Sequence, residues 1–328
     1  MTFRCFAAAC AMDVRQLRYF VNIVDYGSLG KAAEKLNVAQ PSLSQQIVRI
    51  EDELGMTLLL RSRQGVQPTA AGRALYRHAR IVLRQMEQLR EEVRDGADAE
   101  TGSVAVGLPT TMASVFAMSL FERVQQRHPG IRLQYFESMS GYINELLANG
   151  RLDLAILFRD SDTPGVSTLP LFDEQLYVFG EPGGNVAPRS RTCALRDLDG
   201  VRLVAPSVHN GLRMLIERAF VREQIEPNIV ADIDSLPTLI AIAQSGAACT
   251  ILPTSALMRY DMARRPKIRR LVDPPIVRPA SLCWPNTVSF SSATLAVRRV
   301  LIELIDEAMH SGRWHGVTLR EGLLETVR

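Results

Sequence analysis

A helical stretch between residues 40 and 54 carries polar side chains that could bind another molecule. Its apolar residues recur at three- and four-residue intervals on one face, at Leu43, Ile47, Ile50 and Leu54. The opposite face holds Ser42, Gln45, Gln46 and Arg49. Glutamine and serine hydrogen-bond to base edges or phosphates, and arginine binds guanine or phosphate. The pattern therefore favours contact with nucleic acid, although a merely solvated surface helix has the same pattern.

Further groups suited to phosphate flank this helix. Gln40 and Ser42 stand at its start, where side-chain donors would combine with exposed backbone N–H groups, and Pro41 is tolerated in a first turn. Arg61 and Arg63 lie in a short segment with a glycine turn, which is typical of a β-hairpin with a basic tip. Such a tip would meet the DNA backbone or the minor groove.

The elements around this helix follow a recognisable order. An amphipathic helix is expected over Val14–Asp25, and a second, short helix follows with Ser28 as its N-cap. The third helix ends at Gly55, and a hairpin is expected over residues 58–68. This is the order of a winged helix-turn-helix, whose third helix enters the major groove. The first part of the chain is therefore predicted to bind double-stranded DNA.

A long helix is expected after Thr69, which is placed to cap it, and continues to about Val93. Its apolar residues are separated by alternating steps of four and three, the 3.5-residue period of a coiled coil. They are Leu75, Ala79, Val82, Met86 and Leu89. A helix packed on its own domain would explain them, but a heptad stripe between two domains favours a seam with a second copy. A homodimer or homotetramer is therefore predicted.

After the polar segment Asp95–Gly102, predicted strands alternate with predicted helices, which indicates parallel sheets covered by crossover helices. The strands are expected at Val104–Leu108, Ile131–Phe136, Leu152–Phe158, Gln175–Phe179, Arg202–Ala205, Ile229–Ile233 and Cys249–Leu252. The helices are expected at Ala113–Arg127, Tyr142–Asn149, Gly211–Gln224, Leu236–Ser245 and Ala293–Met309. Roughly 225 residues is long for one sheet, so two lobes are predicted. The proline-rich Val272–Pro279 would cross back, and the last helix would pack on the first lobe.

The predicted fold is α followed by α/β, the latter two-lobed like a periplasmic binding protein. Its parts are a disordered extension at 1–11, a winged helix-turn-helix at 12–70, a linker helix at 71–95, a two-lobed domain at 103–310 and a tail at 311–328. Lobe I would comprise 103–168 and 273–310, and lobe II 169–272. Met12 is an alternative first residue.

A two-lobed α/β domain binds small molecules where strand carboxyl ends and helix N-termini meet. The residues expected at such a cleft directly follow predicted strands: Thr110, Thr111, Ser138, Met139, Ser140, Ser207 and His209. Hydroxyls and free backbone N–H groups there would form an anion site. Serine and threonine are also ordinary helix N-caps, so either role fits.

Composition argues against several classes of protein. The chain of 328 residues is 47% hydrophobic, and no uncharged apolar run approaches the roughly 18 residues of a membrane span. Five scattered cysteines without ligand spacing predict reduced thiols in the cytoplasm and no metal site. Neither an enzyme nor a cofactor is expected, because no nucleotide, nucleophile or metal motif is evident. The first 95 residues hold 14 Lys and Arg against 10 Asp and Glu, a mildly basic balance that suits nucleic acid.

A specific pattern spans Ala32–Glu51 and has the form A-A-x-x-L-x-[VI]-x-Q-[PS]-x-[LV]-S-x-Q-[IV]-x-x-[LI]-E. It lies within LRYFVNIVDYGSLGKAAEKLNVAQPSLSQQIVRIEDELG, and LLLRSRQGVQPTAAG follows. On these residues the chain resembles LysR-type bacterial transcription regulators, and a looser likeness covers residues 13–310. The resemblance implies recognition contacts at Gln40, Pro41, Ser42, Ser44 and Gln45, wing contacts at Arg61 and Arg63, and phosphate contacts at Ser28 and Thr69. Gly30, Leu60 and Pro68 depart from the family's usual threonine, phenylalanine and leucine.

Within that family, the runs YFVNIVDYGSL and GVQPTAAGRALYRHARIVLRQMEQ look most like the nitrogen assimilation control branch. This implies transcriptional control of nitrogen-assimilation genes, with RNA polymerase as a further partner. The alternatives are a regulator of an unrelated catabolic operon that answers to a small carboxylate, and a solute-binding protein. The cleft would either sense a small anion or be vestigial in a regulator governed by its own abundance.

Overall fold

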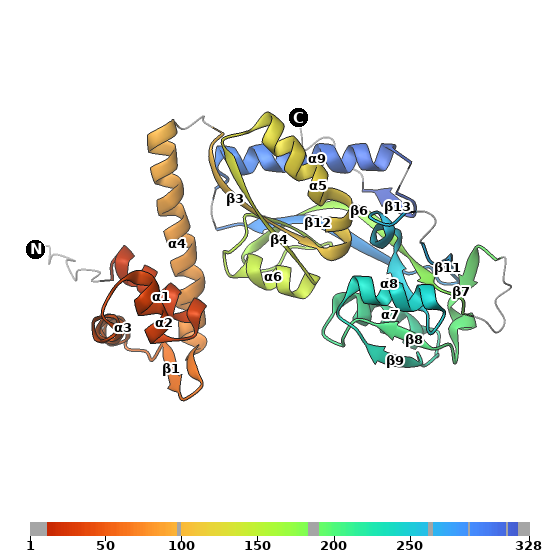
Figure 1. Cartoon of the computed structure of the whole chain (residues 1–328), viewed down its shortest axis with the longest axis horizontal. Helices are drawn as coiled ribbons and strands as arrows, with labels where there is room; N and C mark the ends of the chain where they lie inside the picture. The colour runs from red at the N-terminus through yellow and green to blue at the C-terminus, as the bar shows by residue number, and fades with distance from the viewer. Residues whose placement is uncertain are drawn as a thin grey trace, which may run out of the picture. The chain divides into compact units, whose positions relative to one another are not determined.

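The computed structural model describes residues 12–96, 100–182, 190–261, 265–287, 289–312 and 314–320. They form two compact units, one that ends at Gly96 but also includes residues 149–151, and one that contains most of the remaining chain (Figure 1). The extension expected at 1–11 lies outside the described residues, and so does part of the expected linker segment.

Three helices open the first unit: α1 (Val14–Tyr26), α2 (Leu29–Leu36) and α3 (Gln40–Leu54). A capping box starts α1, because Asp13 Oδ1 accepts from the Gln16 N–H at 2.7 Å and Gln16 Oε1 accepts from the Asp13 N–H at 2.9 Å. Left-handed residues at 27, 37 and 55 end the three helices. Their apolar faces form one core around fully buried Phe20, Ile23, Leu43, Ile47 and Ile50.

An antiparallel hairpin follows, formed by β1 (Leu59–Ser62) and β2 (Gly65–Pro68). Glu51 on α3 holds its beginning, since Oε1 accepts from two successive backbone N–H groups at 2.7 and 3.1 Å. The second arm begins at Gly65, where only glycine fits. Its φ is +127°, and a Cβ there would lie 2.5 Å from the carbonyl oxygen of Gly27. Both arms of the predicted wing are thus docked on the helices.

The long helix α4 (Ala70–Asp95) begins at the predicted Thr69 cap, whose Oγ1 accepts a first-turn N–H at 3.0 Å. Tyr76 ties α4 to α1, because its hydroxyl donates to Asp25 at 2.5 Å and Arg80 bonds the same carboxylate at 3.0 Å. Burial, together with this hydrogen bond, raises the pKa of Tyr76 to about 12. The first turns of α4 therefore belong to the core of this unit.

Periodicity misplaced three apolar residues of the first unit. Leu54, expected on the buried face, is 43% exposed because it is the last residue of α3, beyond the end of that face. Leu75 and Ala79, expected at a seam with a second copy, pack instead against the core of their own unit. Ala79 is buried there, whereas Val82 and Leu89 are exposed.

The first lobe of the second unit is a sheet with helices on both faces. The strands β3 (Gly102–Pro109), β4 (Ile131–Ser138) and β5 (Leu154–Leu157) are parallel, and β12 (Val277–Pro285) lies antiparallel to β5. One face packs against α5 (Thr110–Arg127) and α9 (Ser292–His310), as expected for the last helix, and the other against α6 (Ser140–Ala148). Val104 and Ala105 illustrate the alternation, since they join opposite cores.

The strand β6 (Val166–Phe179) runs through both lobes and pairs antiparallel with β12. Leu171 and Phe172 pack in the core of the first lobe, although the predicted boundary assigned them to the second. Leu176 does lie in the second-lobe core. Only Gln175–Phe179 was expected to be a strand, because polar residues and a proline interrupt the apolar pattern before it. The sheet is mixed rather than parallel, so that expectation was wrong.

The second lobe contains β8 (Leu203–Ala205) and β9 (Ile229–Asp232), which are parallel, and β10 (Thr250–Pro253), which is antiparallel to β6. Its helices are α7 (Gly211–Arg222) and α8 (Leu236–Ser245). Two strands of this lobe were not predicted, β7 (Thr192–Ala194) and β11 (Ile268–Val272), and neither was β12 of the first lobe, where only a chain crossing was expected. Single turns of 3-10 helix lie at Leu195–Leu198 and Thr254–Leu257.

Residues after α9 complete the first lobe rather than forming a tail. Trp314 is buried between Phe116 and Phe172, with ring centroids at 5.6 and 4.9 Å and edge-to-face geometry. The three-residue strand β13 (Val317–Leu319) then pairs with β6. A lone tryptophan and so short a strand leave no periodic signal, which is why the expectation of a tail failed for residues 314–319.

Candidate nucleic-acid interface and ligand cleft

The polar face of α3 is open to solvent, as its spacing predicted. Leu43, Ile47 and Ile50 are fully buried on one side of the helix. On the other side, Gln40, Pro41, Ser42, Gln45 and Arg49 are exposed and Ser44 is half-buried. A shallow hollow on this face is bordered by Pro41, Ser44, Gln45, Val48 and Arg49. The backbone N–H groups of the first turn, which have no partner within the helix, point toward the same end.

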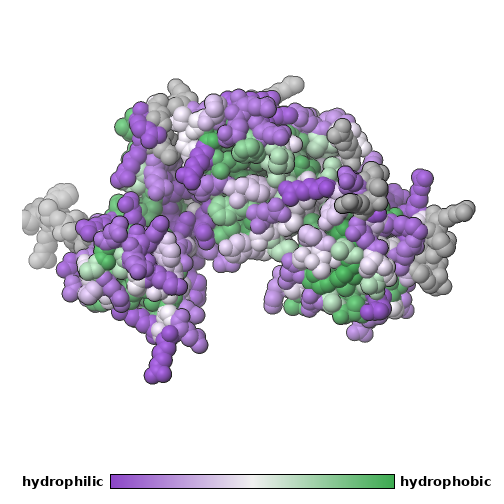
Figure 2. All heavy atoms as spheres, viewed as in Figure 1, coloured by the Kyte–Doolittle hydropathy of each residue, from purple (hydrophilic) through white to green (hydrophobic). Residues whose placement is uncertain are grey.

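The wing lies against this face. Arg61 Nη1 donates to Ser44 Oγ at 3.0 Å, so strand β1 and helix α3 meet at two predicted contact residues. Arg63 follows in the exposed turn of the hairpin. The hairpin tip projects from the helices and is hydrophilic (Figure 2). Wing and helix together offer donors and positive charge on one continuous surface.

Three of the predicted polar groups also have structural partners. Gln46 Oε1 accepts from Gln16 Nε2 at 3.0 Å, so this side chain is held against α1 and not on the open face where its spacing placed it. Ser28 Oγ accepts a first-turn N–H of α2 at 3.4 Å. Thr69 Oγ1 donates to the carbonyl oxygen of Thr57 at 2.8 Å besides capping α4. For Ser28 and Thr69, contact with phosphate stays a prediction.

The second half of α4 carries the three residues of the expected seam that do not pack in the core of their own unit. Val82 and Leu89 are exposed and Met86 is half-buried, on the side of the helix that continues the Leu75–Ala79 stripe. An apolar stripe left uncovered within its own unit fits a second copy better than solvent. That these residues form the seam stays a prediction.

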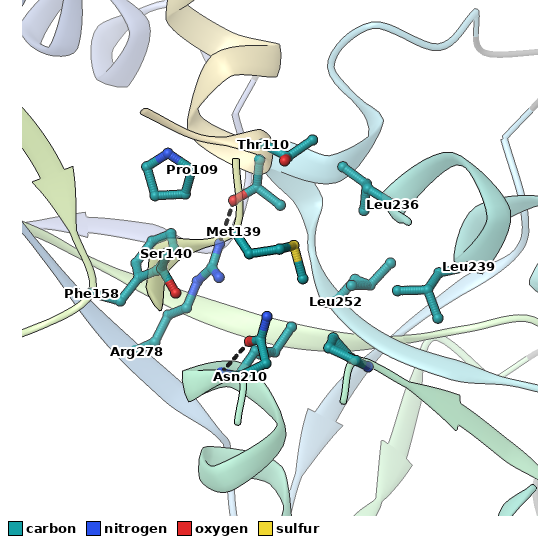
Figure 3. Close-up of a pocket in the computed structure, with 13 residues that line it drawn as sticks. Pro109, Thr110, Met139, Ser140, Phe158, Asn210, Leu236, Leu239, Leu252 and Arg278 are labelled. Atoms are coloured by element: carbon teal, nitrogen blue, oxygen red, sulfur yellow. Dashed lines mark hydrogen bonds between the residues drawn. The ribbon is translucent and has the colours of Figure 1, made fainter. Parts of the chain in front are cut away.

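The second unit has a cleft at the carboxyl ends of β3 and β4 (Figure 3). The first lobe lines it with Pro109, Thr110, Thr111, Met139, Ser140 and Phe158, and the second with Pro206, Asn210, Leu212, Leu236, Leu239 and Leu252. Arg278 on β12 completes the lining. The free volume is about 50 Å³, well below the roughly 300–1,000 Å³ of typical ligand pockets. In this state the cleft holds little more than water.

Four of the seven predicted cleft residues line it: Thr110, Thr111, Met139 and Ser140. Ser138, Ser207 and His209 do not; Ser138 still belongs to β4, and the Ser207 N–H is bound to Asp234 Oδ1 at 3.0 Å. Asn210, one position beyond His209, reaches the cleft and caps α7. Leu212, Leu239 and Leu252 were missed because apolar residues in a helix or strand look like ordinary core.

Arg278, which lines the cleft, forms a buried ion pair with Glu174. Arg278 donates to Glu174 Oε2 through Nε at 3.0 Å and through Nη2 at 2.7 Å, and Nη2 also donates to Thr111 Oγ1 at 2.9 Å. Glu174 is fully buried and accepts from Trp314 Nε1 at 3.3 Å. The guanidinium stacks on Phe158, 3.6 Å from the ring centroid. Burial lowers the pKa of Arg278, and Glu174 opposes that shift.

This pair determines the electrostatics of the cleft. Arg278 is the only charged side chain among the described residues that line it, and Glu174 matches its charge. The rest of the lining is mostly apolar, with three hydroxyl groups and one amide, which lie at the N-terminal ends of α5, α6 and α7. A small anion would therefore compete with a buried carboxylate for the guanidinium.

Metal and membrane chemistry find no support in the described part of the chain. No group of three or more His, Cys, Asp or Glu side chains there is arranged to hold a metal ion. No helix there combines the length and hydropathy of a membrane crossing. Cys193, Cys249 and Cys283 are free thiols, and burial raises the pKa of each to about 11. Cys5 and Cys10 lie outside the described residues.

Comparison with known proteins identifies both units. Residues 14–73 match the family described as bacterial regulatory helix-turn-helix protein, lysR family, and residues 97–306 match the LysR substrate binding domain. The chain belongs to the LysR family of bacterial transcription regulators. It is therefore a DNA-binding regulator, and the solute-binding alternative is wrong for the chain as a whole because of its helix-turn-helix. The family is one of regulators rather than enzymes.

Similarity to individual LysR-type proteins extends over almost the whole chain. It is 35% identical over 312 residues to the nitrogen assimilation regulatory protein nac of Escherichia coli (strain K12). The aligned residues cover 94% of this chain and 100% of that protein. The nac protein of Klebsiella aerogenes is 35% identical over 300 residues, 90% of this chain and 95% of that protein.

Solved structures of full-length regulators share the fold. Full-length OxyR from Pseudomonas aeruginosa has a TM-score of 0.69 at 24% identity and covers 94% of this chain and 99% of that one. CbnR complexed with its target DNA has a TM-score of 0.51 at 24% identity and covers 90% of this chain and 100% of that one. The predicted two-part architecture is confirmed.

The open face of α3 predicts a division of labour between helix and wing. Gln45→Ala should weaken binding to the specific operator by about 1–3 kcal/mol and binding to random DNA little, because base contacts carry the sequence information. Arg61→Ala should weaken both and lower the slope of log affinity against log salt by about one, since one phosphate contact is lost. Fluorescence anisotropy at several salt concentrations measures all four affinities.

Gln46→Ala is the matched control, because that glutamine is one position away but is bonded to Gln16. It should leave the ratio of specific to random binding unchanged. Equal losses on both DNAs for Gln45→Ala would show that Gln45 does not read bases.

The buried pair makes a second prediction. Glu174→Gln leaves the Arg278 charge without its counterion, and breaking a buried ion pair in this way costs about 3–5 kcal/mol of unfolding free energy. Adding Arg278→Met should recover most of that loss, because an apolar side chain then packs on Phe158. Urea unfolding followed by tryptophan fluorescence is suitable, since both tryptophans, Trp284 and Trp314, lie in this unit. A single variant as stable as the wild type, or a double variant worse than the single one, would contradict the pairing.

Proposed function

We propose that this LysR-type regulator controls genes of nitrogen assimilation. The observation that carries the proposal is its 35% identity to two nitrogen assimilation regulatory proteins, maintained from the helix-turn-helix through the cleft domain over 94% and 90% of this chain. It would act on the chromosome in the cytoplasm, through base contacts by Gln40, Pro41, Ser42, Ser44, Gln45 and Arg49 and backbone contacts by Ser28, Arg61, Arg63 and Thr69. RNA polymerase is the partner through which transcription changes.

A second candidate is a catabolic regulator that responds to a small carboxylate. The cleft disfavours it, because Arg278 is already paired with Glu174 and the surrounding lining is mostly leucine, methionine and proline. An incoming carboxylate would have to displace Glu174 or leave two like charges buried together, which is unfavourable. We therefore place the regulation of this protein in its abundance rather than in an anionic effector.

Mapping the bound chromosomal sites in the native host, under nitrogen limitation and under nitrogen excess, tests the proposal. The bound promoters should precede genes for the uptake and breakdown of nitrogen compounds. Purified full-length protein should bind them without added ligand, and millimolar acetate or benzoate should not change the affinity. Binding confined to one catabolic operon, with affinity that depends on the carboxylate, would replace this function with the second candidate.

The proposed DNA-binding species is an oligomer joined along the second half of α4. Two recognition helices would then meet successive major-groove faces roughly 34–36 Å apart, on an operator with two-fold symmetry. Val82→Glu with Met86→Glu would bring like charges together in the seam, so dimers should dissociate and operator affinity should fall. Sedimentation velocity and anisotropy measure the two effects.

Gln88→Glu is the control for charge, because that side chain lies on the other side of α4 from Met86. It should leave both the sedimentation coefficient and the affinity unchanged. A double variant that stays dimeric with wild-type affinity would place the seam elsewhere on the chain.

A further inference from the structure

Val48 is an apolar residue in the middle of the polar face of α3. Its side chain is 45% exposed, and it borders the same hollow as Ser44, Gln45 and Arg49. Single exposed valines are common on protein surfaces. The surroundings of this valine are unusual, because three of the four other residues that border the hollow carry hydrogen-bonding side chains, and the fourth is Pro41.

The geometry of α3 puts Val48 in line with the predicted reading residues. Gln40, Pro41, Ser44, Gln45 and Val48 are spaced i, i+1, i+4, i+5 and i+8, so they occupy one side of the helix over successive turns. At 1.5 Å per residue, Val48 lies about 12 Å along the axis from Gln40, the length of three to four base pairs. A helix lying in the major groove brings all of these positions to the bases.

The side chain cannot turn away from that face. Leu43 and Ile47 are fully buried on the far side of α3, which fixes the rotation of the helix. The wing adds a second restraint through the bond from Arg61 to Ser44, one turn before Val48. A β-branched side chain in a helix has one strongly preferred rotamer, so the partly exposed side chain of Val48 has little freedom to move away from this face.

The chemistry of the major groove then limits what Val48 can contact. Valine has no donor or acceptor for base edges or phosphates, and the one apolar group that the groove offers is the C5-methyl of thymine. We propose that Val48 packs on a thymine methyl in each half-site and makes the regulator prefer thymine over cytosine at that position. Gln46 does not compete for the base, because Gln16 holds it. Asp52, one turn farther along the same side, would be repelled by phosphate and marks the end of the contact.

Binding-site selection from randomised DNA with the full-length protein tests this proposal against Val48→Ala and Gln46→Ala. The wild type and Gln46→Ala should select the same motif, with one thymine in each half-site that Val48→Ala no longer selects. In a fixed operator, deoxyuridine at that thymine should lower wild-type affinity about fourfold per contact, the equivalent of burying one methyl group. The same change should leave the affinity of Val48→Ala unaltered.

A methylated base separates contact from DNA shape. Replacing the thymine pair with a cytosine pair should weaken wild-type binding, and 5-methylcytosine at that position should restore part of the affinity for the wild type but not for Val48→Ala. An identical motif for the wild type and Val48→Ala would overturn the proposal. So would a deoxyuridine effect of equal size in both proteins, or a loss with Val48→Ala that is the same on random DNA.

Discussion

The cleft domain depends on one buried interaction, the ion pair between Glu174 and Arg278. These residues lie on β6 and β12, the strands that pair with each other, and β6 continues from the core of the first lobe into that of the second. Two desolvated charges are tolerated only when their remaining donors and acceptors are satisfied. Thr111 and Trp314 do this, because they bond the guanidinium and the carboxylate. The start of α5 and the segment after α9 are thereby held to the same point.

The helical unit uses polar groups in the opposite way. Its core is mainly apolar, and carboxylates act where elements meet: Asp13 caps α1, Glu51 binds the start of the wing, and Asp25 ties α1 to α4. Each is bonded to backbone or to a side chain of another element. On the open face of α3, Ser44 accepts from Arg61, whereas the side chains of Gln40, Ser42 and Gln45 have no hydrogen-bond partner among the described residues. A DNA-reading face needs such side chains, since a glutamine that is bonded within the fold, such as Gln46, is less available to a base.

Features that depend on residues close together in the sequence could be predicted, whereas contacts between distant residues could not. The two faces of α3, the wing and the Thr69 cap follow from spacing within a dozen residues, and they are as expected apart from Leu54 and Gln46. Glu174 and Arg278 are 104 positions apart, and nothing in either neighbourhood marks a pair. Trp314 likewise packs on Phe172 across most of the domain. Ala79 fitted the heptad as well as Val82 did, because periodicity gives the side of a helix but not which neighbour covers each turn.

Arg61 and Arg278 show how the same side chain acquires opposite roles. Arg61 is exposed and bonds a neutral hydroxyl, and no carboxylate of the described chain pairs with it, so its charge remains available to phosphate. Arg278 is buried against Glu174, so its charge is cancelled before any ligand arrives. The first attraction is long-range and weakens with salt, whereas the second is shielded from solvent and much less sensitive to salt. Arg61 therefore keeps a charge that can attract the DNA backbone, whereas Arg278 adds no net charge to the cleft because Glu174 balances it.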